Sequence, residues 1–399
     1  MKHLGDITRI NGNEAPIVDC IIGGSPCQDL SLAGKRAGLA GARSGLYMEQ
    51  IRIIKEMREQ DVLRGKATVD VRPRYMVWEN VPGAFSTNGG KDFAAVIEEA
   101  IRVAEPEAPD VPVPQKGWPT SGCYMGECWS VAWRVLDAQF WGTSDKPLPQ
   151  RRRRIALVAD FGGLSAPEIL FVRKSVSGNI EPGKQERKET PGDAGEGFGI
   201  SVPVTLKIRS GCEGGGKGAL IQTDMSATLS TLQDQTLFHP VAGPAYSMKS
   251  IARSGKVFTE LANPICSSDY KDPDIEGYPD KESRYIVRRL TPLECERLQG
   301  FPDGWTDIGE WVDSKGKKHK EADSPRYKAL GNSIAIPPWK WVLKRLCACY
   351  ERDVTMASLF DGIGGFPYIW EQINGKGSCL WASEIEEFPM AVTRLRFGG

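Results

Sequence analysis

The stretch GGSPCQDLS, residues 23–31, places a proline directly before a cysteine, at the end of an apolar run of strand length. Such a thiol is either a small buried hydrophobe or a nucleophile, because a cysteine reacts only where its surroundings favour the thiolate. The Pro-Cys pair alone favours the inert interpretation. If Cys27 reacts, other parts of the chain must bring acids and cations to the same place.

Charged side chains adjoin two further apolar runs. The run RYMVWENV, residues 74–81, ends near Glu79, and QRRRR, residues 150–154, leads into the run RRIALVADF. Carboxylates and guanidinium groups beside a thiol can transfer protons and stabilise developing charge. Alternate residues of a strand point to one face, so Arg152 and Arg154 should project together if the basic run enters a strand.

A glycine-rich turn, DGIGG at residues 361–365, lies near the C-terminus between an apolar run and a helical pattern. Glycines let a backbone approach a ligand closely. Glu384 stands at the end of the next apolar run, where an acid commonly binds ribose hydroxyls. The pattern indicates an adenosine-containing cofactor and fits a nicotinamide dinucleotide poorly, since it is not G-x-G-x-x-G. A turn without a ligand is the alternative.

Alternating strand and helix patterns must position these residues, and they predict an α/β fold. Thr291, Pro292 and Glu294 form a capping box that starts a helix. Strands are expected over 18–24, 74–81, 153–161 and 354–360, and helices over 47–60, 92–104 and 337–351. Residues 175–199 are polar and rich in glycine, which indicates a linker. Residues 200–285 show strand-like pieces between turns, which indicates a β-rich insert.

Composition sets broad limits. The chain has 399 residues, a length that permits two domains. Its formal net charge is zero, which neither favours nor excludes binding of nucleic acid. No apolar run is long enough to span a membrane and no signal peptide is visible, so we expect a cytoplasmic protein. The ten cysteines lack a disulfide framework or a zinc pattern, and no metal is expected. The basic run KGKKHK, residues 315–320, is interpreted as a solvated face.

The motifs SPCQ, ENV, QRRRR, RRLTPLECERLQGFP, GNSIAIP and LFDGIGGF together resemble the motif set of the DNA cytosine-5 methyltransferases. The resemblance covers both α/β segments, and it covers the insert only by position. It implies a Rossmann-like class I S-adenosylmethionine-dependent methyltransferase fold, with a mostly parallel sheet flanked by helices. The implied domains are a catalytic part at 1–164, a target recognition domain at 165–285 and a second catalytic part at 286–399.

The order of the motifs departs from the family. The family usually begins with the cofactor motif, whereas LFDGIGGF lies near the C-terminus here and the chain opens with GDITRI, residues 5–10, which resembles the third motif. Reading the tail into the head restores the usual order. We therefore expect a circularly permuted member whose ends lie side by side.

The resemblance implies a role for each motif. Cys27 would attack C6 of a flipped-out cytosine, Glu79 would bond N3 and the exocyclic amine, and Arg152 and Arg154 would contact the ring carbonyl and a nearby phosphate. The implied methyl donor is S-adenosyl-L-methionine. Its expected contacts are Phe360, Asp361, Gly362, Gly364, Gly365, Glu384, Ile385, Asp6, Ile7, Pro26, Asn332 and Ser333. Ile385 stands where family members often have an aromatic residue.

The resemblance implies that the substrate is double-stranded DNA and that the enzyme is a monomer in a bacterial or phage-infected cell. The enzyme would belong to a restriction-modification system, a phage or a mobile element. The segment 28–44 is long enough to close over a flipped base. The expected DNA contacts are Gln28, Ser31, Arg43, Asn80, Gln150, Arg209, Lys217, Gln222 and Gln233. An RNA cytosine-5 methyltransferase and a catalytically silent DNA-binding relative are the alternatives.

Overall fold

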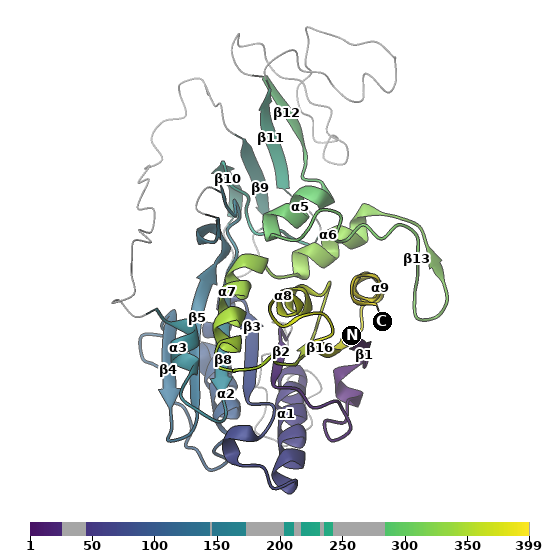
Figure 1. Ribbon diagram of the computed structural model, residues 1–399. Coiled ribbons are helices and arrows are strands. Elements are labelled where there is room, and N and C mark those ends of the chain that lie inside the picture. The colour runs from purple at the N-terminus through teal and green to yellow at the C-terminus, as the bar shows by residue number, and fades with distance from the viewer. Residues whose placement is uncertain are drawn as a thin grey trace.

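The computed structural model describes residues 1–25, 45–143, 146–172, 203–210, 217–231, 235–241 and 284–398. Its centre is a sheet of order β1-β16-β15-β2-β3-β8-β5-β4 (Figure 1). The first five strands of that order are parallel, and β8 runs antiparallel to β3 and β5. The bounds are β1 Lys2–His3, β2 Cys20–Gly23, β3 Tyr75–Asn80, β4 Ser121–Met125, β5 Ser130–Asp137, β8 Arg153–Asp160, β15 Met356–Leu359 and β16 Cys379–Ser383.

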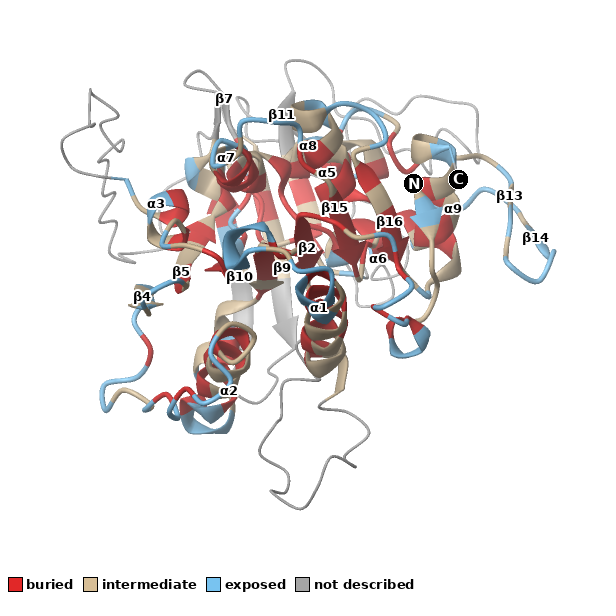
Figure 2. Ribbon diagram, turned by 60° about the horizontal axis from the view of Figure 1, so that its bottom comes forward, coloured by how far each residue is buried: buried red, intermediate tan, exposed pale blue. Residues whose placement is uncertain are grey.

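Helices cover both faces of this sheet because successive strand residues point to opposite sides. Ile21 of β2 packs in the cluster that includes α1 and α2, whereas Ile22 packs in the cluster that includes α7 and α8. Figure 2 shows the buried sheet between these layers. The helices are α1 Gly45–Leu63, α2 Lys91–Ile101, α3 Ala166–Leu170, α5 Pro292–Gln299, α6 Asp323–Asn332, α7 Ile336–Cys347, α8 Gly365–Asn374 and α9 Glu387–Phe397. The predicted α/β class is confirmed.

The strand that carries the glycine-rich turn, β15, lies in the middle of the parallel strands, with β16 and β1 on one side and β2 and β3 on the other. An antiparallel strand, β8, then follows at the far side. This arrangement is the class I methyltransferase sheet, in which the cofactor strand is central. The fold expected from the motifs is therefore the one observed.

The insert forms a separate antiparallel sheet of order β10-β9-β11-β12. Its strands are β9 Val204–Ser210, β10 Lys217–Thr223, β11 Gln235–Val241 and β12 Arg284–Arg289. β12 extends past residue 285, and α3 packs in the core of the large sheet. Small two-stranded pairs complete the described strands: β6 Gly142–Thr143 with β7 Lys146–Pro147, and β13 Trp311–Val312 with β14 Lys318–His319.

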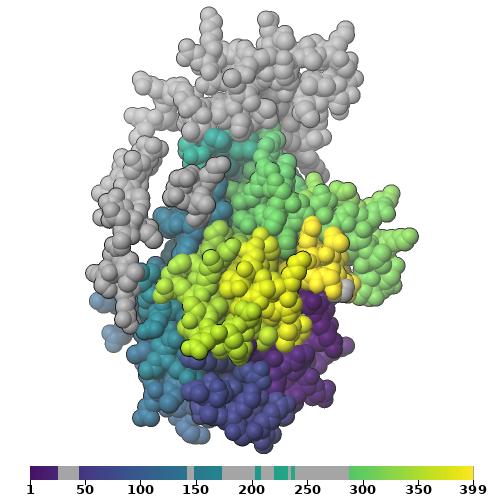
Figure 3. Space-filling model, viewed as in Figure 1, coloured from purple at the N-terminus to yellow at the C-terminus, as the bar shows by residue number. Residues whose placement is uncertain are grey.

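The two ends of the chain meet at one edge of the sheet. β1 pairs in parallel with β16, and the amino group of Met1 lies 3.4 Å from the carbonyl oxygen of Phe397. Figures 1 and 3 show the purple N-terminal and yellow C-terminal segments side by side. The C-terminal segment thus supplies the centre of a sheet that the N-terminal segment completes.

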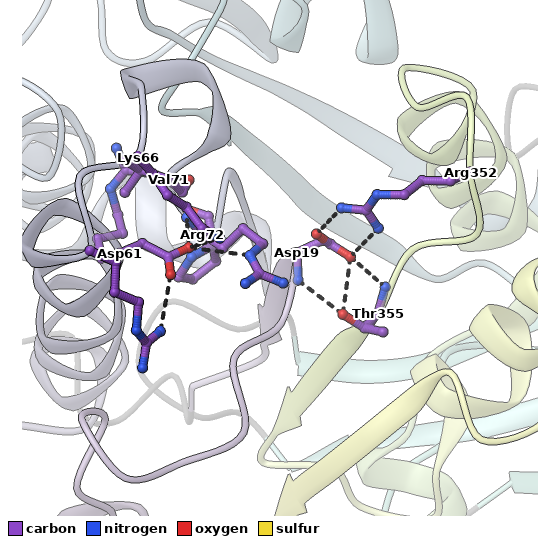
Figure 4. A network of polar contacts seen from close by, with 10 residues as sticks. Asp19, Asp61, Lys66, Val71, Arg72, Arg352 and Thr355 are labelled. Atoms are coloured by element: carbon purple, nitrogen blue, oxygen red, sulfur yellow. Dashed lines mark hydrogen bonds and ion pairs between the residues drawn. The ribbon is translucent and has the colours of Figure 1, made fainter.

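A buried carboxylate fastens these segments together (Figure 4). Asp19 is 1% exposed, accepts hydrogen bonds of 2.6 and 2.9 Å from Arg352, and accepts another of 2.8 Å from the backbone N–H of Thr355. Burial opposes ionisation of Asp19, but the hydrogen bonds from Arg352 and Thr355 outweigh it and lower the pKa of the carboxyl. Asp19 therefore acts as an anion that joins β2 to β15.

Candidate active site

An acid and an arginine meet where β3 and β8 lie side by side. Asn80 pairs with Ile155 and Glu79 with Ala156 in the antiparallel ladder, so Glu79 and Arg154 lie close together. Nε of Arg154 lies 2.7 Å from Oε1 of Glu79, and each side chain is 15% exposed. A charge-assisted contact in partly desolvated surroundings orients both groups.

The strand that leads to the Pro-Cys pair ends against the same carboxylate. Nε1 of Trp78 donates to Oγ of Ser25 at 3.0 Å, and Nδ2 of Asn80 donates to the Ser25 carbonyl at 3.0 Å. A Cβ added at Gly24 would lie 2.9 Å from Oε2 of Glu79, so glycine permits this approach. Asn80 is therefore fixed within the protein, since it is 3% exposed and bonds Ser25 and Val81.

The residues that follow Ser25 lie outside the described part of the chain. They include the predicted nucleophile Cys27 and the predicted contacts Pro26, Gln28, Ser31 and Arg43. The role of Ser25 was not predicted, although its place in GGSPC was visible in the sequence.

The two predicted arginines are placed differently. Arg154 faces Glu79, whereas Arg152 is 1% exposed and donates through Nη2 to the backbone carbonyls of Gly331 and Ser333. Gln150 is also fully buried, and its amide has no hydrogen-bond partner among the described residues. Arg152 lies immediately before β8, which begins at Arg153, and the charges of both Arg154 and Glu79 act on its guanidinium.

The glycine-rich turn is organised by Glu384. This carboxylate accepts hydrogen bonds from the backbone N–H of Gly362 at 2.7 Å and of Ile385 at 2.7 Å. A Cβ added at Gly362 would meet no atom within 4 Å, and Ile385 is 68% exposed. Asp6 begins a short 3-10 turn after β1, and its hydrogen bonds from Thr8 lower the pKa of its carboxyl. An open backbone, an exposed apolar side chain and two acids fit an adenosine-containing cofactor.

Other predicted cofactor residues serve the packing of the turn. A Cβ at Gly364 would lie 2.5 Å from the Phe397 ring, and one at Gly365 would lie 2.8 Å from Ile334. These glycines therefore allow helices to pack closely, whether or not a ligand is near. Phe360 adopts a positive φ of 55°, and Ile7 is buried in the core. Asn332 ends α6 beside Ser333, and the contact of Ile334 with Gly365 brings this segment to the turn.

Asp361 points into the core. It is 6% exposed, Oδ1 accepts a 2.5 Å hydrogen bond from Ser358, and Oδ2 has no partner among the described residues. Burial raises the pKa of Asp361 to about 8, and the charge of Glu384 adds to this shift against the hydrogen bond from Ser358. The carboxyl of Asp361 is therefore mostly neutral near pH 7, and its hydrogen bond with Ser358 holds the start of the turn against β15.

We expect Asp361→Asn to remove a pH dependence of stability. The folded-state pKa lies above the unfolded value of about 3.9, so the native state binds the extra proton and wild-type stability falls as pH rises between them. The slope is about 1.4 kcal/mol per pH unit. Urea unfolding at pH 5, 6 and 7 should show the variant gaining stability relative to the wild type by that increment. Parallel curves would contradict the assignment.

The predicted sequence readers are only partly placed. Arg209 and Lys217 lie in β9 and β10, where Arg209 pairs with Gly218 and Lys217 with Ser210. Gln222 is 8% exposed and so is not presented on the surface of the insert, while Gln233 lies outside the described residues. The lysines of residues 315–320 are exposed, as expected for a solvated hairpin. Within the described ranges no helix is long and apolar enough to span a bilayer, and no three His, Cys, Asp or Glu side chains are grouped so that they could hold a metal ion.

Comparison with known proteins identifies the family of the chain. The model of the C-5 cytosine-specific DNA methylase family matches residues 1–103 and 125–348. A DNA N-6-adenine-methyltransferase of Escherichia phage P1 is 28% identical over 88% of this chain and 56% of its own length. The Type II methyltransferase M.BsuFI of Bacillus subtilis is 24% identical over 86% of this chain and 60% of its own length. This chain thus spans less than two thirds of either relative.

Among solved structures, S. pombe Dnmt2 methyltransferase matches 86% of this chain and 82% of that chain, with 14% identity and a TM-score of 0.39. Because this TM-score is low, the fold is assigned from the strand order of the central sheet. The family match includes β1 to β3, β5, β8, the strands of the insert and α5 to α7. The chain belongs to the C-5 cytosine-specific DNA methylase family.

Proposed function

We propose that the protein transfers a methyl group from S-adenosyl-L-methionine to C5 of a flipped-out cytosine in a specific duplex DNA sequence. The observation that carries this proposal is the contact between Glu79 and Arg154 beside the anchored end of β2. It supplies an acid and a cation at the place where the chain leads to a thiol. The family membership supports the same chemistry.

Cys27 serves as the nucleophile. Its thiolate forms a bond to C6 of cytosine, and the π electrons of the C5–C6 bond shift so that C5 becomes nucleophilic. After methylation, loss of the C5 proton to a base re-forms the double bond and expels the thiolate. The buried target carbon of a stacked base is out of reach of any side chain, so the cytosine must leave the duplex first.

Glu79 and Arg154 hold the ring. Glu79 bonds N3 and the exocyclic amine, where a proton offsets the charge that thiolate addition places on the ring. Arg154 fixes the Glu79 carboxylate through their ion pair and would contact the ring carbonyl. Asn80 holds the Ser25 carbonyl, so its role is to fix the strand end and not to touch DNA.

The cofactor contributes an electrophilic methyl group when bound. Glu384 would hold the ribose hydroxyls while keeping the Gly362 N–H in place, and Ile385 would cover the adenine. Asp6 would accept a hydrogen bond from the adenine amine, because its carboxylate is ionised. Asn332 and Ser333 would lie at the methionine end, next to the glycine-rich turn.

The test is product analysis on plasmid DNA from cells that express the protein. Nucleoside mass spectrometry should find 5-methyldeoxycytidine, and bisulfite sequencing should place it in one short sequence. N6-methyldeoxyadenosine alone would show that the protein methylates adenine, as the name of its phage P1 relative states for that protein. Methylation of tRNA but not duplex DNA would favour the RNA alternative, and no product from either would favour the silent DNA-binding relative.

We also propose that the chain is a circular permutation of the usual family order. The family match ends at residue 348, before the cofactor motif, although β15 and β16 complete the sheet. The chain ends lie at the edge where β16 meets β1. The permutation leaves the sheet unchanged, because only the connection between two neighbouring strands differs.

Relinking the chain tests this second proposal. A protein in which Gly399 is joined to Met1 through a short flexible linker and the chain is reopened before Val354 should fold and bind S-adenosylmethionine with wild-type affinity. Calorimetric titration of the cofactor measures this. A relinked protein that folds but binds no cofactor would show that the connection between β16 and β1 is misplaced.

A further inference from the structure

Arg152 occupies a junction of three segments that belong to different parts of the sequence. Its own segment precedes β8, where the Arg152 N–H donates to Oδ1 of Asp137 at 3.2 Å. Its guanidinium donates to the carbonyls of Gly331, at 3.0 Å, and of Ser333. These carbonyls end α6, where the helix leaves them unpaired and the helix dipole favours a cation. Arg152 is therefore a C-terminal cap for the helix that leads to Asn332.

The insert joins the same junction. The Ser226 N–H donates to the Pro149 carbonyl at 2.6 Å, and the Arg151 N–H donates to the Ser226 carbonyl at 3.1 Å. Oγ1 of Thr228 donates to the Arg151 carbonyl at 2.6 Å. A short ladder thus connects the segment before β8 to the insert.

The insert also contacts the end of α6 at Gly331. A Cβ added there would lie 2.6–2.7 Å from the backbone of Ser230 and Thr231, so the insert packs directly on α6. Behind this ladder, Oγ of Ser226 and the N–H of Ala227 both donate to Oε1 of Gln235, which is fully buried. The insert, the segment before β8 and the end of α6 are therefore packed as one unit around Arg152.

The surroundings of Arg152 also differ from those of Arg154, which forms an ion pair with Glu79. No carboxylate forms an ion pair with Arg152 within the described ranges, and its Nε and Nη1 lack partners there. Burial, and then the neighbouring charge of Arg154, lowers the pKa of Arg152 well below its usual value. The hydrogen bonds to the Gly331 and Ser333 carbonyls are the ones that Arg152 makes through its guanidinium in the described residues. Losing them would leave a buried cation without partners, which is costly, so the guanidinium holds these carbonyls in place.

We propose that Arg152 is a positioning residue that fastens the insert and the Asn332–Ser333 segment to the start of β8, so that sequence reading and cofactor binding depend on one guanidinium. This inference rests on the proposed function for its substrates. It revises the expectation that Arg152 contacts the flipped cytosine and leaves that role to Arg154.

The experiment compares Arg152→Lys with Arg154→Lys, two matched changes that keep the charge and remove the planar fork. Arg152→Lys should weaken S-adenosylmethionine binding about tenfold, the loss expected from one charge-assisted hydrogen bond, and should speed hydrogen exchange at the Arg151 and Ser226 amides. It should also reduce the preference for the cognate sequence over single mismatches while turnover at saturating cofactor is largely kept. Arg154→Lys should lower turnover and leave cofactor affinity and exchange unchanged.

Gly331→Ala provides an independent disturbance of the junction, because its methyl group would press on Ser230 and Thr231. It should reproduce the signature of Arg152→Lys with the arginine intact. A fall in turnover for Arg152→Lys, with cofactor affinity and amide exchange unchanged, would overturn the proposal. Calorimetry and hydrogen exchange need no DNA, so they test the junction even if the wild-type protein methylates no DNA.

Discussion

Cys27→Ser should abolish methylation, with turnover reduced by at least about a thousandfold, while binding of DNA and S-adenosylmethionine is largely kept. A hydroxyl is a far weaker nucleophile than a thiolate at neutral pH and cannot add efficiently to C6. Single-turnover methylation of a duplex that contains the target sequence measures the chemical step. Equilibrium binding of the same duplex checks that the site remains intact.

A second readout follows the covalent bond itself. A target cytosine with fluorine at C5 cannot release that substituent as a proton is released, so the adduct should persist through denaturing electrophoresis in the wild type and be absent in Cys27→Ser. Cys128→Ser is the matched control, since Cys128 is an exposed thiol distant in sequence from the motifs, and it should retain both activity and adduct. Wild-type turnover by Cys27→Ser would exclude the covalent mechanism.

Sequence patterns predicted the parts of the molecule that are determined by neighbouring residues in the chain. The buried run at Cys20–Gly23 and the capping box at Thr291 were predicted close to their observed places because local sequence determines them. Strand β5 was missed, although most of it is buried, since its arginine and mixed polar residues break the alternation. Its identity as a strand depends on its position between β4 and β8, which is a tertiary property.

In the candidate site, too, local sequence predicted some features, whereas others depend on the tertiary structure. Glu79 and Arg154 were predicted from their motifs, and the ladder between β3 and β8 brings them together. The sequence could not separate Arg154 from Arg152, because two residues in one basic run look alike until the start of the strand is known. It also could not distinguish Gly362, which faces open space, from Gly364, which makes room for Phe397.

The second large effect is expected for Glu79→Gln. Glutamine keeps the size and hydrogen-bonding capacity of the side chain, so it can still bond N3 and the exocyclic amine, but it cannot carry the shared proton. Turnover should therefore fall by about 10²–10⁴, the range for loss of a general acid, while the KM for DNA changes little.

A fall in turnover with little change in the KM for DNA would distinguish the proposed role of Glu79 from a purely structural role. The substitution leaves Arg154 without its carboxylate partner, 2.7 Å away in the wild type, so some loss of stability is expected from the arginine alone. Arg154→Lys with Glu79 intact controls for that loss, because it weakens the same pair and keeps the carboxyl group. If Glu79→Gln raises KM for DNA and leaves turnover unchanged, the carboxyl only binds the base, and the proton that offsets the charge on the ring must come from another group.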